Sequence, residues 1–524
     1  MARAVGGRAR RPGAGRSPVR AAAVTLAALA TLTAATAAAQ PPAEAEAAEA
    51  ADVVSPFLPP THWAVAAVRR AEALGLLDDA LPARRELPRA LVGRALRQAW
   101  RRGAEQAPAH AALMAGWYAR FAEEFREAEA ERRGELPSVQ PLGAAAFAGY
   151  EYADGRVAPG LGERGEERTG ALPLPDVSGA RVGAALGVRV GGVVAVEVEP
   201  AWSADGVELA RADLLAGWGP VYVAAGRQAI GYGPGIGGGV VLGGAARVDR
   251  LEVGTNRTVR LPRGLRWLGP ASFHSFMART NEGRHPGEPY LWGASGTLRP
   301  HPRLTLAVHR AALFGGERAS PITLRRLLSM LIGEVRGSVF EDQVVAAEGR
   351  LRLPTEALLP LTLYLEWGSE DAAGAWFDVP GRVVGAYVPS LPGAPAAALG
   401  VEYSRFRPSC CGNPPWYRHS LFPGSWALDE VPLGHALGGH GSELLLYGEV
   451  APLAARLRLA GRAFRRERER ENLFAPERVG ISHGGRVEAW WRVGARQELT
   501  VEFFREAGDG WSEARAGAGL RLFF

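Results

Sequence analysis

The chain of 524 residues contains 61 basic and 55 acidic residues, which gives a formal net charge of +6 and a pI of about 9.6. Six arginines lie between residues 3 and 20, and without them basic and acidic residues are equal in number, so the charge indicates no nucleic-acid partner. The absence of lysine excludes a Walker phosphate loop in its usual form, and the adjacent Cys410 and Cys411 provide no disulfide framework.

The amino terminus predicts export. The arginine-rich start carries no acidic residue and is followed by an uninterrupted Ala/Leu/Thr stretch that ends in three alanines at 37–39. We therefore interpret residues 1–39 as a signal peptide and residues 40–60, rich in Pro, Ala and Glu, as a flexible leader. No later apolar run reaches the about 18 residues of a transmembrane helix, so a membrane-spanning role would fall to strands.

Residues 61–136 show helical periodicity. The spacing of apolar residues predicts a first helix from about Trp63 that stops at Gly75, and a second helix that opens at Pro88. A third helix is predicted through Leu113 and Phe125, with acidic residues and arginine on its outer side. These helices form a small unit.

After residue 137 the pattern becomes that of strands. Residues 182–190 alternate apolar residues with Arg and Gly, and residues 194–199 continue the alternation after Gly191–Gly192, a favoured hairpin turn. The pattern recurs at 345–353 and 455–463. Ionic residues on the second strand face suit either the polar lumen of a barrel or the solvated face of a soluble sandwich.

The last strand favours the barrel. Apolar residues share one face and arginines the other, and the chain ends on Phe524, as do bacterial outer-membrane barrels that present this residue to their assembly machinery. The apolar face is formed by Ala516, Ala518, Leu520, Leu522 and Phe524, and the other face carries Arg515 and Arg521. Residues 137–524 accommodate roughly 16 to 20 spanning strands, at about 20 residues for a strand with its turn. The even-numbered barrel would then turn at Ala507–Gly510 on the outer surface.

Two segments interrupt the strand pattern. Leucines at 324, 327, 328 and 331 predict an amphipathic helix that folds on or into the barrel rather than crossing the membrane. Residues 233–238 match G-x-G-x-x-G, but Pro234 lies inside the motif and no helix is predicted after it. A tight turn or a close backbone approach inside a barrel is therefore favoured over nucleotide binding.

Polar clusters give little support for catalysis. The cluster His419, His435, His440 and Glu443 matches no standard zinc spacing, so we expect hydrogen bonding in loops and no metal or cofactor. We interpret Glu366, Glu370 and Asp371 as a solvated turn. The sequence has no G-x-S-x-G motif and no recognisable triad, so we do not expect an enzyme.

Aromatic residues of one loop region are more informative. Trp416, Tyr417, Phe422 and Trp426 alternate with Arg418, His419 and Asp429. Aromatic faces stack on sugar rings, and Arg and His hydrogen-bond hydroxyl or acidic groups. The alternative is an aromatic girdle at the lipid interface. We take Trp416, Tyr417, Arg418, His419, Trp426 and His435 as candidate glycan-binding residues.

Several segments together resemble the Wzi-type capsule assembly proteins of the bacterial outer membrane. Residues 61–63 with 73–77 are similar to the family's N-terminal helical unit, 226–235 to its "GR…WGPG" strand and turn, and 363–371 to its "YgEw…ED" strand. The most extensive match joins 416–419 to 432–443, where the family reads "WY.H…LGHPLG.DG.EL" and this chain has Ala436 for Pro and His440 for Asp.

The resemblance implies a mainly β protein: a transmembrane antiparallel β-barrel of about 18 strands over 137–524, with a small α-helical periplasmic domain at 61–136 against its opening. It also implies a non-enzymatic outer-membrane protein that binds exported capsular polysaccharide and helps to attach or organise it at the cell surface. Its expected partners are surface polysaccharide, outer-membrane lipid and the barrel assembly machinery. The alternative is a porin-like diffusion channel, which the polar strand faces would suit.

Overall fold

The structure is a computed structural model. It describes residues 53–128, 137–155, 179–204, 206–280, 288–316, 320–332, 341–370, 380–406, 416–417, 426–428, 431–452, 456–470, 472 and 478–524. The predicted signal peptide, most of the predicted leader, Cys410, Cys411 and Asp371 lie outside these residues.

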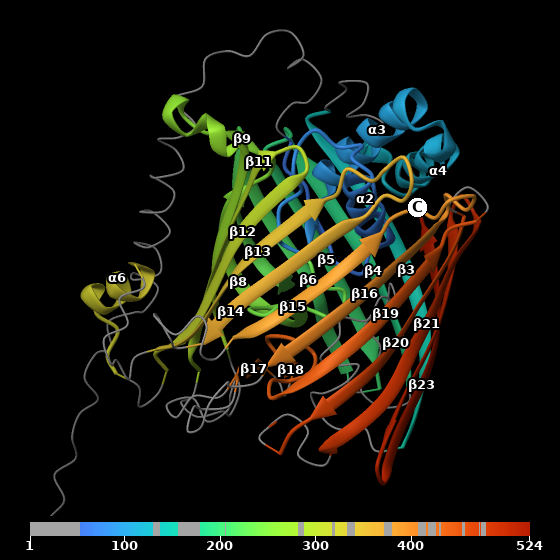
Figure 1. Cartoon of the computed structure of the whole chain (residues 1–524). Helices are drawn as coiled ribbons and strands as arrows, with labels where there is room; N and C mark the ends of the chain where they lie inside the picture. Colours follow the sequence, from blue (N-terminus) through green and yellow to red (C-terminus); the bar gives the residue numbers. More distant parts are fainter. Residues whose placement is uncertain are drawn as a thin grey trace, which may run out of the picture.

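A closed antiparallel barrel dominates the molecule (Figure 1). Within the described residues eighteen long strands form it, each paired with the next in chain order, and the ring closes where the last strand, β23, pairs with the first, β3. The strands are β3 (Val139–Gly155), β4 (Gly179–Val190), β5 (Val194–Ser203), β6 (Gly206–Trp218), β7 (Val221–Gly231), β8 (Gly243–Thr255), β10 (Pro270–Arg279), β11 (Tyr290–His301), β12 (Leu304–Phe314), β13 (Glu341–Arg352), β14 (Thr362–Glu370), β15 (Gly381–Val388), β16 (Ala397–Phe406), β19 (Gly441–Val450), β20 (Leu457–Arg468), β21 (Gly480–Gly494), β22 (Gln497–Gly508) and β23 (Trp511–Phe523). The predicted fold class and strand number are confirmed.

Five shorter strands have two residues each. They are β1 (Phe57–Leu58), β2 (Leu87–Pro88), β9 (Val259–Arg260), β17 (Ala427–Leu428) and β18 (Val431–Pro432). β1 pairs with β2 and β17 with β18, while β9 extends the barrel edge beside β10.

The two faces of the strands differ as the alternation predicts. In β21, Val487 is 59% exposed on the outer wall, while its neighbours Arg486 and Glu488 point inward and form an ion pair of 2.5 Å. In β23, Phe524 follows the strand on the exposed side, and Arg515 is buried beside Glu513 at 2.6 Å. Apolar side chains outside and paired charges inside are the pattern of an outer-membrane barrel. Among the described residues, no helix has the length and apolar character needed to cross a membrane.

The predicted hairpin turns are present. Gly191 and Gly192 have φ angles of 58° and 71°, a left-handed conformation that glycine adopts without a steric cost. Gly510, with φ of 76°, closes the turn between β22 and β23 that the sequence predicts at 507–510.

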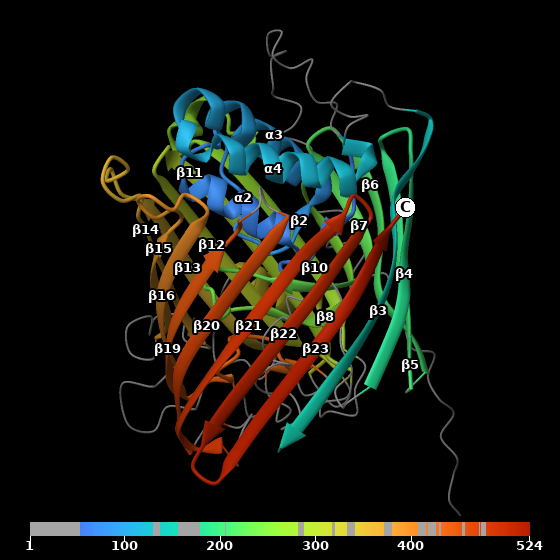
Figure 2. The same ribbon diagram turned by 90° about the vertical axis from the view of Figure 1, so that its right-hand side faces the viewer.

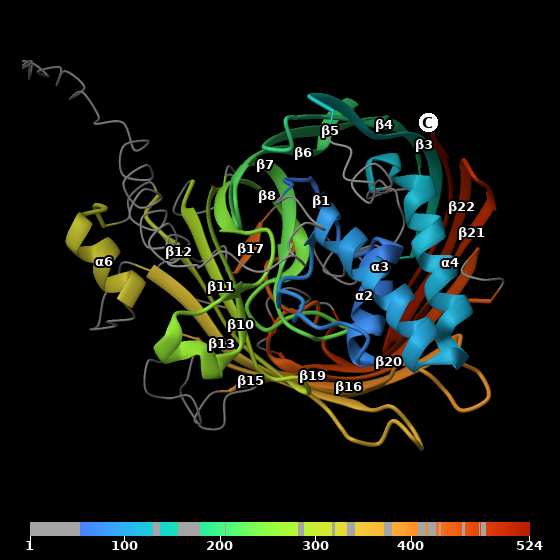
Figure 3. The same ribbon diagram turned by 90° about the horizontal axis from the view of Figure 1, so that it is seen from above.

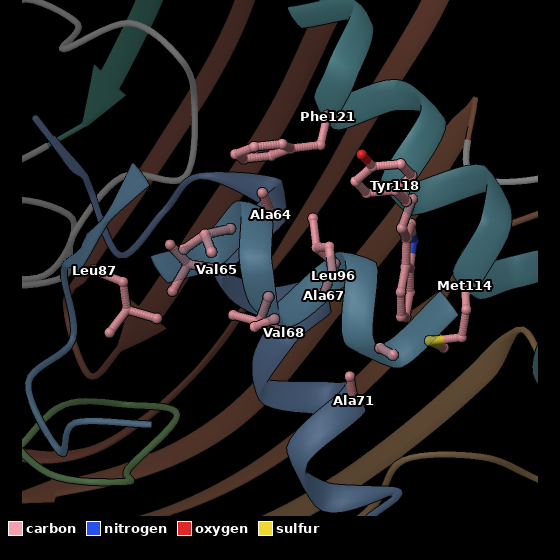
Figure 4. Packing of buried hydrophobic residues seen from close by; sticks show 14 of the residues in the cluster. Ala64, Val65, Ala67, Val68, Ala71, Leu87, Leu96, Met114, Tyr118 and Phe121 are labelled. Atoms are coloured by element: carbon pink, nitrogen blue, oxygen red, sulfur yellow. The ribbon is translucent and has the colours of Figure 1, made fainter. Parts of the chain in front are cut away.

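In the part of the chain that the structure describes, three helices precede the barrel: α2 (Trp63–Ala73), α3 (Arg89–Gln106) and α4 (Pro108–Glu124). Gly75, with φ of 77°, follows the C-terminal end of α2, as predicted. At the other end of α2 the His62 side chain caps the helix by accepting a hydrogen bond from the backbone of Ala64. The apolar faces of the three helices meet in one buried core, with Val68, Leu96 and Phe121 at its centre (Figure 4).

This helical unit sits in the mouth of the barrel at the end where the C-terminus lies (Figures 2 and 3). Buried and partly buried ion pairs connect it to the inner wall. They join Arg84 to Glu252, Arg89 to Glu197, Arg120 to Glu498, Arg70 to Glu449 and Glu72 to Arg350. Several of these groups have a second partner, such as Arg250 beside Glu252 and Arg211 beside Glu197, so the pairs belong to charge networks that together fix the position of the unit.

The described residues include two further helical segments, η3 (Arg263–Leu268) and α6 (Leu324–Ile332). α6 is the predicted amphipathic helix, and it lies outside the barrel wall (Figure 1). Its Leu327 and Met330 pack on Trp292 and Phe314, which belong to β11 and β12. The helix therefore folds on the barrel, as the sequence indicates, and not into its lumen.

Candidate functional site

A glycine-rich segment folds back into the lumen between β7 and β8. We call residues 231–243 the inward strap. Its ends meet where Gly231 pairs with Gly243 and the backbone of Tyr232 donates to the carbonyl of Leu242 at 2.9 Å. The strap also contacts the helical unit, because Gly233 donates to the carbonyl of Ala83 at 3.2 Å. The G-x-G-x-x-G motif thus makes the close backbone approach inside a barrel that the sequence favoured.

Carboxylates of the barrel wall hold the strap. Glu402 accepts hydrogen bonds from the backbone of Ile236 at 2.6 Å and of Gly237 at 2.9 Å, and from the Tyr364 hydroxyl at 2.8 Å. Glu366 accepts one from the backbone of Val240 at 3.1 Å. The charge-assisted bonds satisfy donors that an irregular buried segment would otherwise leave unpaired.

The burial of Glu366 shows that one prediction is wrong. The sequence suggested a solvated turn for Glu366, Glu370 and Asp371, but Glu366 is fully buried on β14. Glu370 accepts a hydrogen bond from the backbone of Tyr417 at 2.6 Å. The error has a simple cause: strand register points these side chains inward, toward the strap and loops, and the sequence alone does not fix that register.

Four of the six candidate glycan residues gather on the other side of the strap. The Tyr417 hydroxyl donates to the carbonyl of Val240 at 2.6 Å and accepts from the backbone of His435 at 3.0 Å. The Trp426 indole donates to the carbonyl of Val241 at 3.0 Å. Trp416 packs edge-on against Phe406 with ring centroids 5.5 Å apart.

All four side chains are buried. Trp416 is 2% exposed, and Tyr417, Trp426 and His435 are fully enclosed. They belong to one core with Val240, or pack against it, inside the barrel. A lipid-facing aromatic girdle is therefore the wrong interpretation for Trp416, Tyr417 and Trp426. Arg418, His419 and Phe422 lie outside the described residues.

Tyr417 is held in a strained backbone conformation. Its φ angle of 66° is unusual for a residue with a side chain and costs on the order of 1–3 kcal/mol. Its amide donates to Glu370, and its carbonyl accepts from the backbone of Trp426 at 3.0 Å. The side-chain and main-chain bonds together offset the strain and fix the turn that precedes Arg418.

A second buried cluster lies beside the strap. Glu402, His435 and Glu443 each place one ligand atom within 4.8 Å of the others. A Cβ at Gly237 would lie 2.7 Å from Glu443 Oε1, 3.1 Å from Glu402 Oε1 and 3.4 Å from His435 Nε2, so these atoms converge on a point that only glycine leaves open.

The cluster does not have the hydrogen-bond pattern of a metal site. His435 Nδ1 accepts from the backbone of Leu437 at 3.1 Å, so the ring proton of neutral His435 lies on Nε2. A metal-binding histidine instead donates through its second nitrogen and keeps a lone pair for the metal. We interpret Nε2 as an N–H donor facing two carboxylates. His440, from the same sequence cluster, faces Glu469 at 3.4 Å.

A hydrogen-bonded chain of Ser295, His309 and Glu348 was missed from the sequence. Ser295 Oγ lies 3.0 Å from His309 Nδ1, and His309 Nε2 lies 2.9 Å from Glu348 Oε2. These residues have the order of a catalytic triad, but Ser295 is 4% exposed and the Tyr232 ring stacks on His309 with centroids 5.1 Å apart. The chain therefore satisfies buried polar groups between neighbouring strands. Only the pairing of Ser295 with His309 across β11 and β12 would have revealed it.

Comparison with known proteins identifies relatives at the level of family and fold. The family model described as capsule assembly protein Wzi matches residues 176–508, more than half of the chain. No curated protein matches the sequence.

Among solved structures, the chain is similar to Wzi of Escherichia coli, described as a carbohydrate-binding β-barrel of the outer membrane involved in group 1 capsule assembly. The TM-score is 0.67 at 16% identity, over 90% of this chain and 99% of that one. OpdL of Pseudomonas aeruginosa matches with a TM-score of 0.45 and 11% identity, over 74% of this chain and 99% of that one. OccK11 (OpdR) of the same organism matches with a TM-score of 0.44 and 11% identity, over 74% of this chain and 96% of that one.

Proposed function

The chain belongs to the Wzi family of capsule assembly proteins, and from this premise we propose that it binds exported capsular polysaccharide and helps to attach or organise it at the cell surface. The observation that carries the proposal is the filled lumen. The helical unit occupies one mouth of the barrel (Figure 3), and the inward strap packs with Tyr417, Trp426 and wall residues in a buried core inside it. A rigid plugged barrel suits a binding platform better than a conduit. The carbohydrate-binding description of Escherichia coli Wzi supports the choice of ligand.

We place residues 61–136 in the periplasm as a helical domain and residues 137–524 in the outer membrane, after removal of residues 1–39 and with 40–60 as a leader. This orientation puts the mouth that holds the helical unit on the periplasmic side and the opposite mouth toward the cell surface. Outer-membrane lipid then contacts the apolar wall, and the barrel assembly machinery is the partner for insertion of β23.

For the glycan site we propose Trp416, Tyr417, Arg418, His419, Trp426 and His435, with a division of roles. The four buried residues anchor the loop through the strap, and Arg418 and His419 contact the sugar. Support comes from the bonds of Tyr417 to Val240 and His435, which fix the chain immediately before Arg418. Preorganisation of this kind lowers the entropic cost of binding.

Retention of the purified full chain on the producer's own surface polysaccharide tests this function. We expect retention by the wild type, loss in an Arg418→Gln/His419→Gln variant, and full retention in the control Arg263→Gln, which changes an exposed arginine of η3 at the opposite rim. A wild-type barrel that does not bind the polysaccharide would contradict the proposal.

We propose a non-enzymatic role. Among the described residues the Ser295–His309–Glu348 chain is the arrangement most like a catalytic centre, and its burial beneath Tyr232 argues against substrate access. Ser295→Ala should therefore leave polysaccharide retention, and the length of the retained polysaccharide, unchanged. Shorter retained polysaccharide with the wild type than with Ser295→Ala would overturn the non-enzymatic assignment.

The diffusion channel is the second candidate, and the charged lumen favours it. The docked helical unit opposes it, so purified protein in planar bilayers should give no stable open conductance. A steady open current from the wild type would favour the channel instead.

A further inference from the structure

A cavity of ≈ 310 Å³ lies inside the barrel, and we call it the luminal chamber. One wall is the face of α2 that carries Arg69 and Glu72, and another is the strap from Gly233 to Gly237. Strands from β11 to β21 complete it, so residues from both halves of the chain converge on one space. It is distinct from the Trp416–Tyr417 cluster, which packs on the opposite side of the strap.

The chamber is strongly basic. Nine arginines and four glutamates line it, although basic and acidic residues are balanced in the chain after residue 20. The arginines are Arg69, Arg85, Arg299, Arg303, Arg350, Arg352, Arg458, Arg462 and Arg486. A concentration of one charge in a cavity with low-dielectric walls attracts ligands of the opposite charge.

Each lining glutamate already has a cationic partner. Glu72 lies 2.7 Å from Arg350, Glu449 lies 2.7 Å from Arg458, and Glu488 lies 2.5 Å from Arg486. The fourth, Glu348, also contacts Arg350 at 2.7 Å. The negative charge of these carboxylates is therefore matched by those arginines. Glu356, outside the cavity lining, also pairs with Arg303 and lies 3.7 Å from Arg352. The excess positive charge of the chamber thus rests on arginines such as Arg85 and Arg299.

Several arginines are held by neutral groups. Arg85 donates to the carbonyl of Gly243 at 3.0 Å, and Arg299 donates to the carbonyls of Asp78 at 3.1 Å and Pro302 at 2.7 Å. Carbonyl oxygens orient a guanidinium without neutralising it. Burial, and to a smaller extent the neighbouring charge of Arg350, lower the pKa of Arg69 to about 10.

The chamber also has features suited to a sugar. Tyr364, Tyr387 and Tyr447 line it, and their rings provide flat apolar surfaces with polar tips. Thr305 and the paired glutamates supply hydrogen-bond acceptors for hydroxyl groups. The volume is at the lower end of the roughly 300–1,000 Å³ of small-molecule sites, which suits a mono- or disaccharide.

We propose that the luminal chamber binds a carboxylate-bearing sugar unit, as an internal site separate from the loop region. The saccharide part of this inference rests on the proposed function. The planar guanidinium groups match a carboxylate in bidentate geometry, and the tyrosine rings receive the pyranose face. The ligand class is thus an acidic saccharide.

The test uses calorimetric titration of the purified full chain in detergent with D-glucuronate and digalacturonate. We expect binding that weakens as salt rises and no binding of glucose at the same concentration. Arg85→Gln should weaken uronate binding roughly tenfold or more, because a charged hydrogen-bond donor is lost, while Arg85→Lys keeps the charge and most of the affinity. Arg263→Gln, outside the chamber, is the matched control.

The outcomes separate the two proposals. Absence of uronate binding, or equal affinity of Arg85→Gln and wild type, overturns the chamber, whatever the wild type does on its polysaccharide. If inorganic phosphate binds with the same affinity as the uronates, the site recognises negative charge alone, and the proposal of a sugar ligand is overturned. Uronate binding by a protein that is not retained on its polysaccharide supports the chamber and contradicts the proposed surface function.

Discussion

The hydroxyl of Tyr417 links the strap to the loop region, so its removal is a sharp test of how the plug is held. Tyr417→Phe keeps the ring but deletes one bond to the carbonyl of Val240 and one from the amide of His435. Both partners are buried, and a buried polar group left without a partner costs about 1–3 kcal/mol. We expect a local loss of about 2–4 kcal/mol, since two groups are stranded by one substitution.

Hydrogen exchange measures this loss where it occurs. A destabilisation of about 2–4 kcal/mol corresponds to roughly 30-fold to several-hundred-fold faster exchange of the His435 amide, at about tenfold for each 1.4 kcal/mol. The matched control is Tyr150→Phe, which removes a hydroxyl from a side chain 53% exposed on the outer wall. Exchange at His435 that differs by less than about threefold between the two variants would refute the reasoning.

Three further predictions concern packing and pH. Arg84→Met removes the arginine beside Glu86 and one of the two arginines beside Glu252, which also pairs with Arg250. The change should loosen the helical unit by about 3–5 kcal/mol and speed its release by protease, and unchanged digestion would count against the docking role. Gly237→Ala places a methyl group 2.7 Å from a carboxylate and should lower the unfolding midpoint by the equivalent of about 1–3 kcal/mol. The control Gly494→Ala, whose methyl group would meet nothing within 4 Å, should leave the midpoint unchanged. Equal unfolding midpoints for the two variants would contradict the close packing of the strap. Burial tends to raise the pKa of Glu124, but His62, Arg120 and Arg492 outweigh it and hold the pKa well below its usual range. Docking of α4 should therefore be full above the unfolded pKa of about 4.5 and weaken as the pH falls below it. Protease release of α4 that does not depend on pH, or that depends on pH equally in Glu124→Gln, would argue otherwise.

Much of the fold follows from the sequence because alternation and helical spacing are local signals. Residues 182–190 predict a strand whose apolar side faces lipid, and the structure exposes Val182 and Leu186 on the outer wall. The helices near Trp63 and Pro88 are equally well marked by apolar spacing and by Gly75. Such signals decide which face of an element is buried.

The interior of the barrel depends on long-range register and is less readable. The sequence identifies Trp416 and Tyr417 as unusual, but aromatic residues suit a sugar site, a lipid girdle and a buried core alike. Their burial follows from the strap, whose inward course is set by bonds to Glu366 and Glu402 on distant strands. A one-residue change of register would turn both carboxylates outward, which is why local pattern alone missed them.

The luminal chamber could not be predicted for the same reason. Arginine is the chain's only strongly basic residue type, so any single arginine such as Arg85 or Arg299 carries little information. Their convergence with Arg350 on one cavity appears only when the helical unit is placed in the barrel mouth.

The ratio of cell-bound to released polysaccharide tests the central claim most directly. It is measured in the producing strain with the gene present, deleted, and restored as wild type or as the Arg418→Gln/His419→Gln variant. The account predicts that deletion and the variant shift polysaccharide from the cell to the medium while total synthesis stays constant. An unchanged ratio on deletion, at equal synthesis, would contradict a role in surface attachment.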